Sequence, residues 1–180
     1  MRWMMSLVMM AAVTAGAWAQ TATKPAAKPA AKATAPAPAA TLDPRGHRDS
    51  AASIAELGKK IMAQAAKNPD GLVSFPMDKY PGHYTMLTAR TKSGGGEMHA
   101  DFNDFLIPVE GEASIVIGGT IPDGKLISPG ETRGTKVVGG TSAPMRKGDV
   151  IHILPNTPHQ TVLKPGTTFL YYVIKVGATK

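Results

Sequence analysis

The chain has 180 residues, of which 43% are hydrophobic and none is cysteine. That length corresponds to one domain with appendages, and the hydrophobic content suffices for a packed core, which excludes a chain that is disordered throughout. The lack of cysteine excludes disulfide cross-links and a lipidated N-terminal cysteine, so the fold is held together by its core alone.

The net charge of +7 is concentrated in the first part of the sequence. Residues 1–69 contain nine Lys and Arg against three Asp and Glu, whereas residues 70–180 contain eleven against ten. The second part is therefore close to neutral, and it carries no basic stripe with interleaved aromatic residues. We expect no nucleic-acid partner.

The first nineteen residues have the three parts of a secretory signal peptide. Arg2 supplies the positive start, the apolar run MMSLVMMAAVTAGA follows, and Ala17-Trp18-Ala19 fits a small-x-small cleavage site. The apolar run is too short to span a bilayer comfortably. We expect residues 1–19 to be cleaved, and the protein to be periplasmic or secreted with no stable membrane insertion afterwards.

An Ala/Pro/Lys-rich linker is expected over residues 20–48, because repeated proline prevents a continuous helix and nothing in this segment can fill a core. A single helix is predicted over residues 49–68. Its apolar residues recur at helical spacing, at Ile54, Leu57, Ile61 and Ala65. Asp49 or Ser50 is suited to cap its start.

From residue 69 onward the sequence changes to short β-rich runs separated by glycine and proline. The predicted strands are 72–75, 84–91, 97–100, 104–109, 113–117, 135–138, 150–153, 160–163 and 168–176. Many short strands without intervening helices are typical of an all-β sandwich or barrel, since a parallel sheet would need crossover helices. Residues 69–180 are therefore predicted to form one β-barrel.

Two stretches of this barrel contain residues suited to bind a metal ion. Glu97 and His99 lie two apart, so on a strand both side chains point to one face, and Asp104 follows five residues later. His159 ends a turn held by two prolines, Leu154-Pro155-Asn156-Thr157-Pro158, which fixes the next side chain at low entropic cost. Histidines and carboxylates that converge inside a barrel make a site for a divalent metal.

Both stretches resemble the two motifs of the cupin family, in the usual order. The first motif, G-x5-H-x-H-x(3,4)-E-x6-G, is matched in spacing by Glu97-x-His99-x4-Asp104-x6-Gly111. The second, G-x5-P-x-G-x2-H-x3-N, is matched by Gly148-x5-Leu154-x-Asn156-x2-His159. The resemblance covers about residues 70–180. It implies a double-stranded β-helix (jelly-roll) barrel, here with one N-terminal helix, and a homodimer paired through sheet edges.

The departures from the family pattern affect the expected ligands. Glu97 stands where the family has its first histidine, and Asp104 where it has glutamate. The predicted metal ligands are Glu97, His99, Asp104 and His159, two histidines and two carboxylates. Such a set favours manganese or ferrous iron, with zinc and nickel as alternatives. An alternative set, His99, Asp101 and His159, resembles the facial triad of iron and 2-oxoglutarate-dependent oxygenases.

For function, the resemblance leaves two classes open. One is a metal-dependent enzyme acting on a small polar molecule as an oxygenase, decarboxylase, isomerase or lyase; the other is a metal-free module that binds a small carbohydrate or phenolic ligand. We expect Gln160 to support the site next to His159. We expect His47, His83 and His152 to lie away from it, and one of Tyr171 and Tyr172 to face inward.

Overall fold

The computed structural model describes residues 46–178, so the predicted signal peptide and residues 20–45 of the predicted linker lie outside the described residues. Helix α1 (Ala51–Ala65) comes first, as the apolar spacing predicts. Its N-cap is Ser50, whose hydroxyl accepts a hydrogen bond from the amide of Ser53 at 3.1 Å. None of the helices among residues 46–178 is long and apolar enough to cross a membrane.

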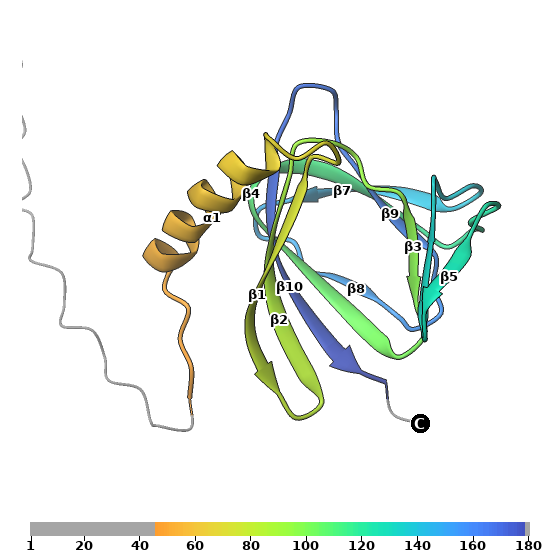
Figure 1. Ribbon diagram of the computed structural model, residues 1–180, viewed down its shortest axis with the longest axis horizontal. Coiled ribbons are helices and arrows are strands. Elements are labelled where there is room, and N and C mark those ends of the chain that lie inside the picture. Colours follow the sequence, from red (N-terminus) through yellow and green to blue (C-terminus); the bar gives the residue numbers. More distant parts are fainter. Residues whose placement is uncertain (1–45, 179–180) are drawn as a thin grey trace, which may run out of the picture. The chain divides into compact units, whose positions relative to one another are not determined.

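Ten strands follow the helix (Figure 1). They are β1 (Leu72–Tyr80), β2 (His83–Arg90), β3 (Gly96–His99), β4 (Phe102–Ile117), β5 (Lys125–Ser128), β6 (Glu131–Gly134), β7 (Thr141–Arg146), β8 (Ile151–Ile153), β9 (His159–Val162) and β10 (Phe169–Gly177). Every pairing between them is antiparallel, in the order β1-β2-β10-β4-β9-β3-β6-β5, with β7 and β8 also paired to β4. The sheet curls into an all-β barrel, as expected from the sequence.

The long strand β4 joins the two halves of the barrel. Its first part pairs with β10 and β8, and its second part pairs with β7 and β9. Gly111 lies where the partners change, with a φ of 79° that favours glycine. A Cβ at this position would lie 2.2 Å from the carbonyl oxygen of Thr168. The glycine therefore allows β4 to bend while β10 stays close beside it.

The two faces of β2 and β10 bury different cores. Leu87, Ala89 and Leu170 face outward and pack against Ile61 and Ala65 of α1, which covers this side of the barrel. Inside the barrel a second apolar cluster contains Leu106, Ala113, Ile115, Met145, Ile153, Leu163, Phe169, Tyr171 and Val173. The polar cavity described below lies beside this inner cluster.

Most of the predicted strands are confirmed, but one is wrong, two belong to a single strand and three were missed. Residues 104–109 and 113–117 are parts of the single strand β4, and β5, β6 and β7 were not predicted. Residues 135–138 are wrong as a strand, because side chains take their amide hydrogen bonds: Asp123 accepts from Thr135 and Gln160 accepts from Val137. Val138 retains only an isolated bridge to Thr120.

Candidate metal centre

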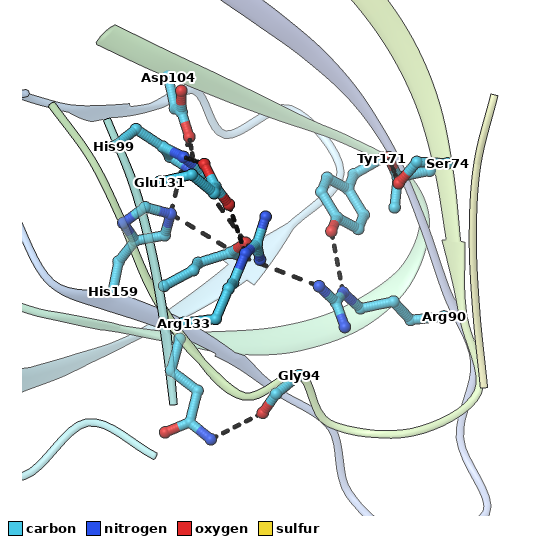
Figure 2. Close-up of polar contacts among 12 residues, drawn as sticks. Ser74, Arg90, Gly94, His99, Asp104, Glu131, Arg133, His159 and Tyr171 are labelled. Carbon is cyan, nitrogen blue, oxygen red and sulfur yellow. Dashed lines mark hydrogen bonds and ion pairs between the residues drawn. The ribbon is translucent and has the colours of Figure 1, made fainter. Parts of the chain in front are cut away.

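The four predicted ligands line one small cavity inside the barrel. Glu97, His99, Asp104 and His159 all contribute to it, and its volume is about 80 Å³. His99 and Glu97 come from β3, Asp104 from β4 and His159 from the start of β9. Figure 2 shows the two imidazole rings side by side, with their centroids 5.2 Å apart.

Both histidines are buried and have their Nδ1 atoms fixed by acceptors. His99 Nδ1 contacts the carboxylate of Glu131, and His159 Nδ1 lies 2.9 Å from the carbonyl oxygen of Thr157. An ionised carboxylate and a carbonyl only accept, so in the neutral imidazole the proton sits on Nδ1 and the lone pair on Nε2. Burial lowers the pKa of both histidines, which favours that neutral form.

The two Nε2 atoms face the carboxylates across the cavity. His99 Nε2 lies 3.3 Å from Asp104 Oδ2 and 3.9 Å from Glu97 Oε2. His159 Nε2 lies 3.6 Å from Asp104 Oδ2 and 3.8 Å from Glu97 Oε1. The lone pairs of the two imidazole nitrogens therefore face those of the carboxylate oxygens. A cation bound between these atoms would remove the repulsion.

The chemistry and spacing of these donors fit a divalent metal. Two atoms that each lie about 2.0–2.2 Å from one ion are at most about 4.4 Å apart, and all four nitrogen–oxygen distances are shorter than that. Glu97, His99 and His159 also offer ligand atoms that all lie within 4.8 Å of one another. Neutral imidazole with the opposite nitrogen bound to an acceptor is the usual state of a metal-ligating histidine.

Cations already contact the carboxylates, and the strand register explains each pair. Lys175 stands directly opposite Asp104 on β10, and its Nζ donates to both carboxylate oxygens at 2.7 Å. On β6, Arg133 stands opposite Glu97 and contacts its carboxylate. Directly opposed side chains lie on one face of a sheet, so the register itself brings each cation into the cavity.

The turn before β9 positions His159 as the sequence indicates. Asn156 occupies the family's glycine position and has a φ of 59°, a left-handed conformation that asparagine tolerates. Its amide donates to the carbonyl oxygen of His99 at 2.8 Å. The turn therefore ties the second motif to the first, and His159 pairs with Glu97 between β9 and β3.

Other sequence-based expectations have mixed outcomes. Asp101 is exposed and does not line the cavity, so the triad of His99, Asp101 and His159 is not formed. Gln160 does not support His159: its amide bridges Gly94 and Val137, because neighbouring residues of β9 point to opposite faces.

The remaining histidines lie outside the cavity, as expected. His152 is exposed, stacks on Phe105 and contacts Asn103 at 3.0 Å. His83 stacks on Tyr80. His47 is not without contacts, since its Nε2 lies 3.1 Å from Asp49 and 3.2 Å from Asp78 at the surface.

Sequence reasoning missed the residues that surround the four ligands. They are Arg90, Glu131, Arg133 and Lys175, while Tyr171 was left undecided against Tyr172. A signal for Lys175 existed, because alternation places it on the same face as Tyr171 and Val173 in the last strand. Tyr171 is the inward tyrosine, and Tyr172 points outward to donate to Asp49.

Comparisons with known proteins support no assignment beyond the fold. No protein-family profile matches the chain, and no curated protein matches it. Similar solved structures include an oxalate oxidase in complex with glycolate, at 15% identity and a TM-score of 0.45, covering 61% of this chain and 53% of the other. The chain thus spans about half the length of that protein.

Two further similar structures are a Schizosaccharomyces pombe Cnp3 cupin domain and a Klebsiella pneumoniae protein with a double-stranded β-helix domain. The first is 8% identical with a TM-score of 0.45, and the match covers 59% of this chain and 65% of the Cnp3 domain. The second is 12% identical with a TM-score of 0.45, and the match covers 61% of this chain and 74% of the Klebsiella protein. Similarity at this level concerns the arrangement of strands and carries no information on substrate or reaction.

Proposed function

We propose that the barrel holds a divalent metal ion through Glu97, His99 and His159, with Asp104 as a fourth ligand, and binds or acts on a small polar molecule there. The observation that carries the proposal is the pair of buried histidines, each with its Nδ1 bound to an acceptor and its Nε2 turned toward carboxylate oxygens. A bound metal would supply a Lewis acid or a redox centre.

The chain's own residues set what such a site can do. Glu131 and the Thr157 carbonyl orient the two imidazoles, and Lys175 holds Asp104 by both oxygens. Burial keeps bulk water away from these groups, which strengthens each electrostatic contact. The donor set of nitrogen and carboxylate oxygen favours manganese or ferrous iron over softer ions. Oxygenase, decarboxylase, isomerase and lyase chemistry are all compatible with such a centre.

Elemental analysis of the purified, untagged chain tests the proposal. The wild type is compared with a His99→Ala/His159→Ala variant and with a His152→Ala control, since His152 is exposed and outside the cavity. Near-stoichiometric metal in the wild type and the control, lost in the double variant, is the expected result. No metal in any of the three after reconstitution with manganese, iron, zinc or nickel overturns the proposal.

A metal-free binding site is the second candidate, and one observation favours it. Glu97 and Asp104 already contact Arg133 and Lys175, so both carboxylates are neutralised without a metal. The part of a ligand that enters this cavity has to be small, since about 80 Å³ is far below the roughly 300 Å³ or more of pockets that enclose larger molecules. A whole carbohydrate or phenolic ring does not fit inside it. The elemental analysis separates the two candidates.

Export is also part of the proposal. It rests on the signal-like residues 1–19 and the linker that follows them in the sequence. Amino-terminal sequencing of the protein from its native cell tests it: a chain that begins at Gln20 supports cleavage after Ala19, whereas a chain that begins at Met1 or Arg2 contradicts it. A homodimer paired through sheet edges stays a prediction from the family resemblance.

A further inference from the structure

We propose that the cavity takes a small carboxylate anion, which enters between Arg90 and Arg133 and is held by the guanidinium of Arg90. The inference deepens the proposed function, and rests on it for the role of the anion as the molecule on which the metal site acts. The anion subsite itself is carried by the arginines, so it can be tested with and without metal.

Arg90 has the longest contact with a carboxylate among the three cations that line the inner cavity. Its residue is 5% exposed, and its Nε donates to the hydroxyl of Tyr171 at 2.9 Å (Figure 2). The nearest carboxylate oxygen, Oε1 of Glu97, lies 3.9 Å from Nη2, beyond hydrogen-bond distance. The two terminal amino groups of Arg90 donate no hydrogen bond to any of residues 46–178. Because Arg90 lines both cavities, these amino groups are free to donate to an anion that enters them.

Arg90 also lines a second, more open and positively charged cavity. This cavity of about 430 Å³ lies outside the first, and Leu72, Arg90 and Arg133 line both. The outer cavity is also lined by Lys92 and Asp70, so three cations face one carboxylate. A cleft with one dominant sign of charge concentrates ligands of the opposite sign and speeds their entry. The two cavities are therefore adjacent, with these three residues between them.

The charges around the inner cavity are balanced only without a metal. Three carboxylates and three cations surround it: Glu97, Asp104 and Glu131, and Arg90, Arg133 and Lys175. A divalent ion would leave an excess of two positive charges in a buried site, which an anionic ligand reduces.

The size and shape of the site indicate a carboxylate. A volume of about 80 Å³ corresponds to two or three water molecules at roughly 30 Å³ each, enough for a carboxylate with one or two carbons. The planar fork of a guanidinium matches the two oxygens of a carboxylate. A longer substrate would leave its remainder in the outer cavity.

Acetate and its neutral isostere acetamide are the probes for a test by NMR titration. Both are titrated into the full chain, once with a chelator and once with manganese or, where paramagnetism broadens the signals, zinc. Acetate is expected to bind in both conditions and at least about tenfold more tightly than acetamide. Arg90→Met is expected to weaken acetate by about tenfold or more, while the control Arg146→Met, which removes an exposed arginine on β7, leaves binding unchanged.

If Arg90→Met does not fold, Arg90→Lys replaces it, because lysine keeps the positive charge but lacks the planar guanidinium that binds both carboxylate oxygens. Acetate should bind Arg90→Lys more weakly than it binds the wild type. The preference of the wild-type protein for acetate over acetamide tests the inference without any variant. Equal affinities for acetate and acetamide overturn the inference. Acetate binding that requires metal and is unchanged in the Arg90 variants also overturns it. Tighter binding of inorganic phosphate than of acetate overturns the assignment to carboxylates. Metal binding without acetate binding leaves the proposed function standing alone, whereas acetate binding without metal binding refutes the metal site and keeps the anion subsite.

Discussion

Replacement of Lys175 by methionine is expected to destabilise the metal-free protein strongly. Lys175 and Asp104 are 7% and 3% exposed, and the ammonium donates to both carboxylate oxygens at 2.7 Å. Methionine keeps most of the side-chain volume but leaves the carboxylate buried without its cation. Loss of one partner of a buried ion pair costs about 3–5 kcal/mol, which lowers the melting temperature of a domain of this size by roughly 10–20 °C.

Urea unfolding in the presence of a chelator, followed by circular dichroism, measures this cost. Lys164→Met is the matched control, because Lys164 is exposed on a loop and its loss should change the free energy of unfolding by less than about 0.5 kcal/mol. Asp104→Leu combined with Lys175→Met should recover much of the lost stability, since an apolar pair replaces the ion pair. The reasoning would be refuted if Lys175→Met lowered the free energy of unfolding by less than about 1 kcal/mol. It would also be refuted if the double variant were no more stable than Lys175→Met alone.

Glu131→Gln is expected to weaken metal binding by roughly 10–100-fold, because the carboxylate that orients His99 is lost. The control Glu112→Gln, on the exposed part of β4, should leave metal binding unchanged. Calorimetric metal titration measures both affinities. Gly111→Ala should destabilise the fold by more than Gly118→Ala. Both glycines have positive φ, at a cost of about 1–2 kcal/mol for alanine, but only at Gly111 does the new methyl meet a backbone carbonyl oxygen. Equal unfolding free energies for these two variants would contradict the role given to Gly111.

Much of the fold follows from periodicity and turn residues. The spacing of Ile54, Leu57 and Ile61 predicts α1, and the runs between glycine and proline predict most of the barrel. The short strands between residues 125 and 146 escaped prediction because most of their side chains are exposed and show no clear alternation. Residues 135–138 have strand-like side chains, yet Asp123 and Gln160 take up their amides.

The candidate site is predictable only in part, for a physical reason. The two motifs bring His99 and His159 together because each sits at a fixed place in a local strand or turn. The cations depend instead on which strands are neighbours and in what register, which local sequence does not specify. Lys175 meets Asp104, and Arg133 meets Glu97, only because β10 lies beside β4 and β6 beside β3.

The register of these strands also determines when the site forms during folding. His99 and His159 come from strands sixty positions apart, and Lys175 comes from the last strand of the barrel. Contacts between such distant segments form slowly and late, because the loops between them have to close first. A ligand that needs the complete set of side chains therefore stabilises the finished barrel and not its folding transition state. Such a ligand should slow unfolding while leaving the folding rate nearly unchanged.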